Sequence, residues 1–319
     1  MDLRTGQLPP DVAAAVRALA ARAAAADGVA PLDEAALLAL TAPTTPTLHL
    51  LTSAHAVAGT TTSADAAGTG VVGYAQVERG GAVGVAQLVV EPAARRRGLG
   101  RALLTAAVAA GAREAWAHGD LPAARALAAA AGWARAHELW RMSLDLRSRP
   151  QLGAEWPRGL VVRPFRPGRD EAAWLAVNAR SFAGHPDQGR WTAADLAARE
   201  REPWFDPAGL LLAERDGELV GFGWAKVHPA GELGPDEVGE LYVLGVDPHA
   251  QGVGLGRALT AAVLDHLAAR GLSTAVLWVA GDSTAAIRTY HRAGFVRAAL
   301  DVRYARDTAG SPGGATMEP

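Results

Sequence analysis

The chain has 319 residues, which is enough for two ordinary domains that each bury a core of their own. Half of the residues are hydrophobic and 20% are charged, a balance typical of a soluble globular protein rather than a disordered or fibrous one. The net charge of -2 and the pI near 6.5 supply no broad positive field. We therefore expect neither a nucleic-acid nor a membrane partner, and the expected ligand is a small molecule.

The absence of cysteine excludes disulfides, thiolate metal sites and a cysteine nucleophile. The first residues contain no basic segment followed by an apolar run, and charged residues interrupt the alanine-rich stretches. We therefore expect the protein to be cytoplasmic. We also expect it to be a monomer and to bind no metal ion. Residues 306–319 are small, polar and rich in Gly and Pro, so we expect them to be disordered.

In chain order, the first half begins its sheet with two strand-like runs, residues 47–57 and 69–77, which we predict to form a parallel pair joined by a Gly/Thr/Ala loop. The next apolar run, residues 85–90, leads through an acid-proline pair into a glycine-rich turn and an Ala/Leu-rich amphipathic helix. A second helix is predicted to end at Gly132, because glycine is the expected helix stop. The predicted order is strand, turn, helix.

The second half repeats this order. Residues 210–227 are predicted to form a hairpin, because Asp216-Gly217 separates two strand-compatible runs. Residues 240–246 then lead through another acid-proline pair into a second glycine-rich turn and helix. Aligning Gly98 with Gly254 gives an offset of 156 residues (254 − 98), close to half the chain, which indicates an internal duplication.

The boundary between the two copies is predicted near Leu152, where Pro, Gly and Ser cluster after a strand-like run. This divides the chain into an N-terminal domain, residues 1–151, a C-terminal domain, residues 152–305, and the tail. Each domain is predicted to be α+β, with a mixed, mostly antiparallel sheet flanked by helices.

The glycine-rich turn of the second half, residues 251–257, places several backbone N–H groups at the start of a helix. Such a turn binds an anion such as pyrophosphate without a lysine, because exposed amides and the helix dipole supply the positive charge. The alternative is a tight strand-to-helix turn packed for its own sake, and the pattern by itself does not separate the two. Recurrence of the turn, each time followed by a helix that ends in Ala-Gly-aromatic, favours the anion site. A Rossmann interpretation is weaker, because Gly-x-Gly-x-x-Gly is missing.

Two segments, Gln251-x-x-Gly254-x-Gly256 and Arg95-x-x-Gly98-x-Gly100, resemble the acyl-CoA motif of the GNAT family of acetyl-CoA-dependent N-acetyltransferases. The resemblance implies two tandem GNAT domains and acetyl-CoA as co-substrate. It also implies the residues that contact the cofactor. In the second half these are Leu244, Gly245, Val246, Gln251, Gly252, Val253, Gly254, Leu255, Gly256, Arg257, Ser283, Thr284, Ala285, Ala286, Ile287 and Arg288. In the first half they are Leu88, Val89, Val90, Arg96, Arg97, Gly98, Leu99, Gly100 and Arg101.

Acetylation of an amine requires removal of an ammonium proton and donation of a proton to the departing thiolate. Glu240, on the strand that leads to the turn, is the predicted base. Tyr290 is the predicted acid, since it lies on the helix that faces the thioester sulfur in the GNAT family. The same offsets in the first half reach Gly84 and Ala128, which cannot move a proton, so chemistry is predicted for the second half only. The alternative is that Glu240 is a solvated strand residue and Tyr290 a packing aromatic.

Four segments narrow the resemblance: SFAGHPDQGRWT, EPWFDPAGLLL, LYVLGVDPHAQGVGLGRALT and DSTAAIRTY. Over nearly the whole chain, and most densely over residues 160–304, the sequence resembles tandem GNAT enzymes that acetylate the cysteinyl amine of Cys-GlcN-Ins, a compound of an amino sugar and inositol. This resemblance implies that Glu34, Asp187, Lys226, Glu240 and Trp278 contact the substrate. Two residues depart from the pattern. Trp278 replaces the usual tyrosine, and Ser283 replaces the usual asparagine, although serine is still expected to cap the helix that follows.

Other interpretations of these residues remain open. Asp187 also suits a turn, Lys226 a strand residue whose apolar stem is buried, and Glu34 the first turn of a helix. At the level of function, two alternatives remain. The chain is a tandem GNAT enzyme that acts on another amine, such as an aminoglycoside or a protein N-terminus, or it is a regulatory module that binds CoA without catalysis.

The remaining histidines and tryptophans are interpreted as structural. The histidines without metal-ligand spacing, interpreted as surface or packing residues, are His185, His228, His249, His266 and His291. The tryptophans interpreted as core and cleft-wall aromatics are Trp174, Trp191, Trp204 and Trp224.

Overall fold

The computed structural model describes residues 1–42, 47–53, 70–80, 83–149, 156–183 and 188–306. The predicted boundary near Leu152, His185, the predicted substrate residue Asp187 and the tail from 307 onwards lie outside these ranges. The chain forms two compact units. Unit 1 comprises Met1–Leu139 together with Leu300–Pro319, and unit 2 comprises Trp140–Ala299.

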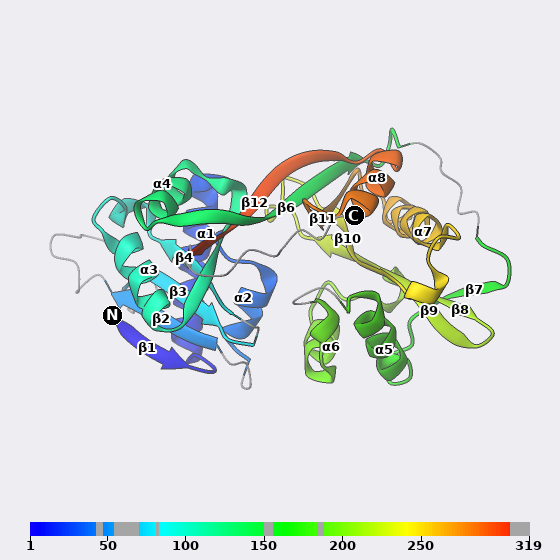
Figure 1. Ribbon diagram of the computed structural model, residues 1–319, viewed down its shortest axis with the longest axis horizontal. Helices are drawn as coiled ribbons and strands as arrows, with labels where there is room; N and C mark the ends of the chain where they lie inside the picture. The colour runs from blue at the N-terminus through cyan, green and yellow to red at the C-terminus, as the bar shows by residue number, and fades with distance from the viewer. Residues whose placement is uncertain (43–46, 54–69, 81–82, 150–155, 184–187, 307–319) are drawn as a thin grey trace, which may run out of the picture. The chain divides into compact units, whose positions relative to one another are not determined.

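Unit 1 is a mixed sheet with helices on both faces (Figure 1). Its sheet has the order β1-β2-β3-β4-β5-β12. The strands are β1 (Asp2–Thr5), β2 (Thr47–Ser53), β3 (Val71–Glu78), β4 (Gly84–Val90), β5 (Ala112–Ala117) and the last part of β12 (Val296–Arg306). The helices are α1 (Pro10–Asp27), α2 (Glu34–Ala39), α3 (Leu99–Ala109) and α4 (Pro122–Ala130).

The predicted parallel pairing of the first two strand-like runs is wrong. β2 and β3 are antiparallel, with Leu50 opposite Ala75. A parallel pair requires a crossover connection, usually a helix. In unit 1 that connection is α3, which links the parallel strands β4 and β5.

Unit 2 has the sheet order β6-β11-β10-β9-β8-β7. Its strands are the last part of β6 (Trp133–Asp145), β7 (Leu160–Pro164), β8 (Leu210–Arg215), β9 (Glu218–His228), β10 (Val238–Val246) and β11 (Thr274–Ala280). Its helices are α5 (Glu171–Ser181), α6 (Ala193–Glu200), α7 (Leu255–Ala269) and α8 (Thr284–Arg292). The predicted hairpin is confirmed, because Asp216 (φ 52°) and Gly217 (φ 81°) connect β8 and β9 with the two positive φ angles that the tight hairpin turn needs.

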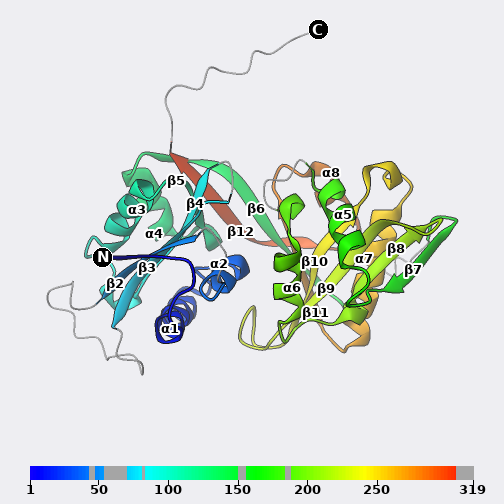
Figure 2. The same cartoon turned by 90° about the horizontal axis from the view of Figure 1, so that it is seen from below.

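Three apolar clusters hold the layers of unit 2 together. Helices α5 and α6 cover one face of the sheet, and α7 and α8 cover the other (Figure 2). On the first face Trp174, Phe222 and Trp224 are completely buried. Trp191 and Trp204 lie against Trp224, with ring centroids 6.3 and 5.8 Å away. The interpretation of Trp174 and Trp224 as core residues is therefore confirmed.

The feature that positions a site is the point where two parallel strands part. In unit 2 the parallel pairing of β10 with β11 consists of Gly239 opposite Ala275 and Glu240 opposite Val276. β10 continues to Val246 with its other edge paired to β9, so its edge toward β11 carries backbone groups without a strand partner in the described part of the chain. Unit 1 has the same arrangement, because β4 pairs with β5 only over its first residues.

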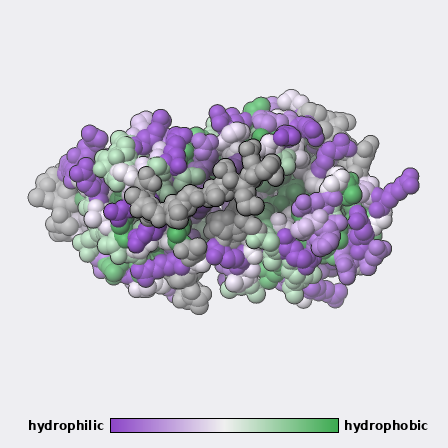
Figure 3. Space-filling model, in the orientation of Figure 1, coloured by the Kyte–Doolittle hydropathy of each residue, from purple (hydrophilic) through white to green (hydrophobic). Residues whose placement is uncertain are grey.

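Hydrophilic side chains are spread over the surface of both units, with smaller hydrophobic areas between them (Figure 3). The large apolar side chains that are exposed are Met1, Leu3, Val83, Val161, Val253 and Val296. Among the described residues, no helix has the length and apolar character that a bilayer crossing requires.

Candidate active site

The predicted base, Glu240, lies on β10 at the last residue pair before β10 and β11 diverge. Its side chain is buried, with 6% of the residue exposed. The carboxylate atom Oε2 lies 2.7 Å from Nε2 of His228 on the adjacent strand β9. The interpretation of Glu240 as a solvated strand residue therefore does not hold.

His228 is itself buried between two carboxylates. Its Nδ1 lies 2.7 Å from Oε1 of Glu232, in the loop between β9 and β10. Burial by itself would lower the pKa of His228, but the hydrogen bonds to Glu232 and Glu240 outweigh it and raise the pKa to about 9. The imidazole is therefore a cation at neutral pH. His228 is not a surface residue, since it is buried. The register of β9 and β10 also brings it to Glu240, a contact that the sequence interpretation did not include.

Two other predicted substrate residues lie at the same place. Lys226 is directly opposite Glu240 in the β9–β10 register, and only 6% of it is exposed. Its ammonium lies 4.8 Å from the ring centroid of Trp204 and 5.3 Å from that of Tyr242, within the range of cation–π attraction. On the neighbouring strand β11, the ring of Trp278 lies 6.2 Å from that of His228.

The predicted acid, Tyr290, lies on α8, where its ring packs edge-on against Phe295 at a centroid distance of 6.1 Å. Burial raises the pKa of Tyr290 to about 12. The phenol therefore keeps its proton at neutral pH and remains a hydrogen-bond donor.

The glycine-rich turn of unit 2 has the backbone geometry of an anion site. Gly254 caps the N-terminus of α7 with φ 91°, and no side chain accepts a hydrogen bond from the first helical amides. Gly252 also has a positive φ, 80°, and no atom lies within 4 Å of the place where a Cβ of either glycine would be. The first amides of a helix have no partner within the helix, so this open turn presents them to a ligand.

The side chain at the first position of the acyl-CoA motif has a structural role in both units. Gln251 donates from Nε2 to the carbonyl of Val246 at 3.1 Å, which ties the turn to the end of β10. Arg95 donates from Nε to the carbonyl of Val90 at 3.2 Å. Contacts of the same kind at the same offset indicate that this side chain shapes the turn, whereas the backbone is available to bind an anion.

One expectation about the second half needs correction. Ser283 is the N-terminal cap residue of α8, but its hydroxyl makes no capping hydrogen bond. Its ψ angle of 64° departs from the extended conformation that usually aims an N-cap side chain at the helix amides. In the adjacent turn, the amide of Thr284 instead donates to the carbonyl of Asp282 at 2.7 Å.

Glu34 is the remaining predicted substrate residue. It lies in unit 1, in the first turn of α2, where Asp33 caps the helix by accepting a hydrogen bond from the amide of Ala36. This is the position in which an acidic side chain is favoured by the helix dipole. A substrate contact by Glu34, or by Asp187, stays a prediction.

In unit 1, the two positions that correspond to the base and the acid have no room for a larger side chain. A Cβ on Gly84 would lie 2.5 Å from the backbone oxygen of Gly111. Ala128 is buried in the core between the sheet and helices α3 and α4. The glycine-rich turn persists, with Gly98 at φ 84° as the cap of α3, but Arg96 takes a left-handed conformation at φ 64°.

A hydrogen-bonded network joins β4 to the end of β5 in unit 1. Gln87 on β4 accepts from the amide of Asp33 and donates to the carboxylate of Asp33. Its Oε1 also lies 3.2 Å from Nε2 of His118, which directly follows β5. His118 in turn lies 3.3 Å from Asp301 of β12. Side chains therefore bridge the two strands of unit 1 where they part.

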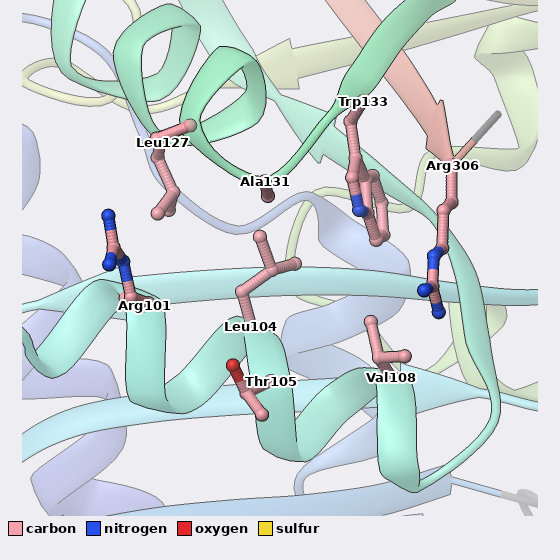
Figure 4. A pocket seen from close by; sticks show the side chains of 9 residues that line it. Arg101, Leu104, Thr105, Val108, Leu127, Ala131, Trp133 and Arg306 are labelled. Atoms are coloured by element: carbon pink, nitrogen blue, oxygen red, sulfur yellow. The ribbon is translucent and has the colours of Figure 1, made fainter.

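Unit 1 also contains a cavity of about 320 Å³ between α3 and α4. Arg101 and Arg306 lie at its two ends, with Leu104, Leu127 and Trp133 among the side chains between them (Figure 4). The cavity contains neither a candidate base nor a candidate acid. Its lining follows α3 from Arg101 to Val108.

Two matches to protein families agree with this geometry. Residues 174–295 match the acetyltransferase (GNAT) family, and residues 60–137 match an acetyltransferase (GNAT) domain. A GCN5-related N-acetyltransferase from Sphaerobacter thermophilus has a similar structure, with a TM-score of 0.63, 24% identity, and coverage of 95% of this chain and 94% of that chain. A tandem GNAT protein from the clavulanic acid biosynthesis pathway has a TM-score of 0.66 at 20% identity, covering 98% of this chain and 100% of that chain. The fold is that of tandem GNAT acetyltransferases, a class that uses acetyl-CoA.

Comparison with curated relatives narrows the class. The mycothiol acetyltransferase of Cellulomonas flavigena is 54% identical over 319 residues, covering 96% of this chain and 89% of the relative. That of Geodermatophilus obscurus is 49% identical over 306 residues, covering 94% and 96%. The chain belongs to the mycothiol acetyltransferase family of GNAT enzymes. The predicted fold class and the predicted acetyltransferase function are both confirmed.

Proposed function

We propose that unit 2 transfers the acetyl group of acetyl-CoA directly to the cysteinyl amine of Cys-GlcN-Ins, which yields mycothiol. The observation that carries this proposal is the buried Glu240 at the point where β10 and β11 part, held by a hydrogen bond from His228. Both substrates bind before transfer, and no covalent intermediate forms on the protein. The site works in a cytoplasmic monomer without a metal ion.

The proton transfers are assigned to two side chains. The substrate amine arrives as an ammonium, and the carboxylate of Glu240 removes one proton, directly or through a water molecule. The free nitrogen lone pair attacks the thioester carbon, a C–N bond forms and the C–S bond breaks. The departing sulfur receives a proton from the hydroxyl of Tyr290, which is protonated at neutral pH. The nitrogen, which still carries one proton more than the amide product, gives that proton through water to the phenolate of Tyr290.

The cofactor is assigned to backbone groups of unit 2. The amides of Leu255, Gly256 and Arg257 at the start of α7 hold the pyrophosphate, since no side chain caps that helix. The free edge of β10 from Leu244 to Val246 pairs with the pantetheine amides and polarises the thioester carbonyl. Open space beside Gly252 and Gly254 supports this assignment.

The sugar and inositol hydroxyls are assigned to Lys226 and Trp278, together with Asp187 and Glu34. Lys226 is suited to this role because its ammonium is held between aromatic rings rather than moving freely in solvent. A fixed donor makes directed hydrogen bonds at lower entropic cost than a mobile one. An indole at Trp278 offers one N–H donor to the substrate, where tyrosine would offer a donor and an acceptor.

Unit 1 is assigned a binding role without turnover. Its turn at Gly98 presents helix amides in the same way as that of unit 2. Arg101 adds positive charge beside the turn. Because Gly84 and Ala128 occupy the places of the base and the acid, any cofactor bound there keeps its acetyl group.

A panel of amines tests the proposed substrate. We expect the purified chain to acetylate Cys-GlcN-Ins with a kcat/KM far above that for glucosamine, an aminoglycoside or an N-terminal peptide, measured by release of free CoA thiol. Equal or faster acetylation of one of the other amines would assign the chain a different acceptor. Acetyl-CoA binding without acetylation of any amine would favour a regulatory module.

A further inference from the structure

Glu240, His228 and Glu232 form a continuous hydrogen-bonded line that runs from the buried base toward solvent. The two hydrogen bonds of the line are both 2.7 Å long. The side chains of Glu240 and His228 are 8% and 5% exposed, whereas that of Glu232 is 47% exposed. The sequence assigns no function to His228 or Glu232.

The hydrogen bonds of this line counteract the effect of burial on the charge of the base. Removal of a carboxylate from water favours its protonated form, which cannot accept a proton from an ammonium. An adjacent cation within hydrogen-bond distance restores the charged form. The imidazolium of His228 is such a cation, and a fixed contact at Oε2 also leaves Oε1 of Glu240 without a hydrogen bond among the described residues.

Other charged groups near His228 do not replace this contact. On β9, Lys226 is the only other cation near the imidazole in the described part of the chain, and its ammonium is engaged by the rings of Trp204 and Tyr242. Glu232 approaches from the loop, Glu240 from β10, and β11 contributes the uncharged indole of Trp278. His228 is therefore the group that donates a hydrogen bond to the base.

We propose that His228 is a positioning residue of the acetyl transfer, which holds Glu240 as an oriented anion, and that Glu232 acts through His228 by keeping it cationic. This inference rests on the proposed function of Glu240. It adds two side chains to the reaction, neither of which touches a reacting atom. The proposal predicts that turnover depends on pH. It also predicts that replacement of His228 and replacement of Glu232 change this dependence in different ways.

Two variants test the proposal through the pH profile of kcat, with the amine that the wild-type enzyme acetylates fastest. In His228→Gln, loss of the cation disfavours the charged form of the buried carboxylate, so the acidic limb of the profile moves to higher pH. kcat at neutral pH falls about 10- to 100-fold, the size expected for loss of a side chain that orients a reactive group. In Glu232→Gln, the acidic limb stays, because His228 is still charged at low pH. His228 keeps only its hydrogen bond to Glu240, so its pKa falls below the wild-type value of about 9 and the alkaline decline of kcat begins at lower pH.

Controls separate positioning from a general structural effect. His266→Gln removes another histidine of unit 2 and leaves both the profile and kcat unchanged. Glu232→Gln replaces a half-exposed side chain and preserves its size, so this variant reports on the mechanism even if His228→Gln folds poorly. Thermal unfolding and the KM for acetyl-CoA are measured for each variant, and both stay near wild type in Glu232→Gln.

The outcomes are distinct. The proposal is supported if the acidic limb moves to higher pH in His228→Gln and the decline at alkaline pH begins at lower pH in Glu232→Gln. A uniform loss of activity without a change in the shape of either profile would overturn it and reduce His228 to a structural residue. Because the assay uses the preferred amine, whatever it is, this result is independent of whether Cys-GlcN-Ins is the substrate.

Discussion

The two units carry the same helix-capping turn and differ at the point where their parallel strands part. Both turns place a glycine with a left-handed backbone at the start of a helix without a capping side chain. In unit 2 the point of parting holds the carboxylate of Glu240, and His228 and Lys226 lie beside it on the adjacent strand β9. In unit 1 a glycine packs directly against a neighbouring backbone, and the side chains of Gln87 and His118 bridge the strands. The comparison shows that the helix-capping turn persists in both units although the side chains beside it differ.

The two units also differ in the space around the backbone at the position of the base. Because a Cβ on Gly84 would lie 2.5 Å from the oxygen of Gly111, no side chain fits there without a shift of one strand. A single substitution therefore cannot convert unit 1 into a second active site. Packing therefore keeps a side chain from the position of unit 1 that corresponds to Glu240.

The largest expected effect comes from the base of unit 2. Glu240→Gln preserves shape and the contact with His228 but cannot accept the ammonium proton, so kcat is expected to fall about 10²- to 10⁴-fold. Affinity for acetyl-CoA, measured by calorimetry, stays near wild type. Glu237→Gln, at an exposed position in the preceding loop, is the matched control and keeps full turnover. If Glu240→Gln kept the turnover of the wild type, Glu240 would be a packing residue and not the base.

The second effect is a dependence of unit 2 stability on pH. The pKa of His228 in the folded chain, about 9, lies above its unfolded value, so its stabilising contribution is complete below pH 6.5 and is lost as pH rises toward 9. The contribution is on the order of 3 kcal/mol. The difference in unfolding free energy between wild type and His228→Gln should therefore narrow as pH rises from 6.5 to 9.5 in urea titrations. A difference that is constant over this range would contradict the assignment of a charged His228.

A third effect tests the packing difference. Gly84→Ala is expected to destabilise unit 1 by about 1–3 kcal/mol, the usual cost of overpacking, because the new methyl group meets backbone that cannot move aside freely. Gly100→Ala is the matched control, since its Cβ would meet Leu127 at an ordinary 3.6 Å. Chemical denaturation measures both. If the two variants were equally stable, the tight approach of Gly84 to Gly111 would not limit unit 1.

The smallest effect concerns the turns. Arg96 has φ 64°, where its counterpart in unit 2 is Gly252 at φ 80°. A left-handed conformation costs a non-glycine residue about 1–2 kcal/mol, part of which the greater freedom of an unfolded glycine cancels. Arg96→Gly should therefore stabilise unit 1 by up to about 1 kcal/mol, and Gly252→Ala should destabilise unit 2 by a similar amount. Unchanged unfolding midpoints in both variants would show that neither turn is strained.

Features that depend on neighbouring residues were predictable from the sequence. The Asp216-Gly217 hairpin and the capping glycines Gly98 and Gly254 follow from local backbone requirements. The duplication and the absence of a base and an acid in the first half follow from a constant offset between the copies. These predictions need no knowledge of which strands lie side by side.

Features that depend on strand register were not predictable in this way. His228 is twelve residues from Glu240 in the chain and meets it only because β9 and β10 pair with Lys226 opposite Glu240. The antiparallel pairing of β2 with β3 and the addition of β12 to the sheet of unit 1 are likewise properties of the assembled sheet. Ser283 shows the limit of a local rule, since its backbone angles keep its hydroxyl from the helix amides.

A crystal structure with acetyl-CoA bound tests the central claim most directly. We expect the pyrophosphate at the first amides of α7 and the thioester between β10 and β11, with the carboxylate of Glu240 and the phenol of Tyr290 both directed at the acetyl group. A thioester found only in unit 1, or one in unit 2 with either side chain turned away from it, would contradict the account.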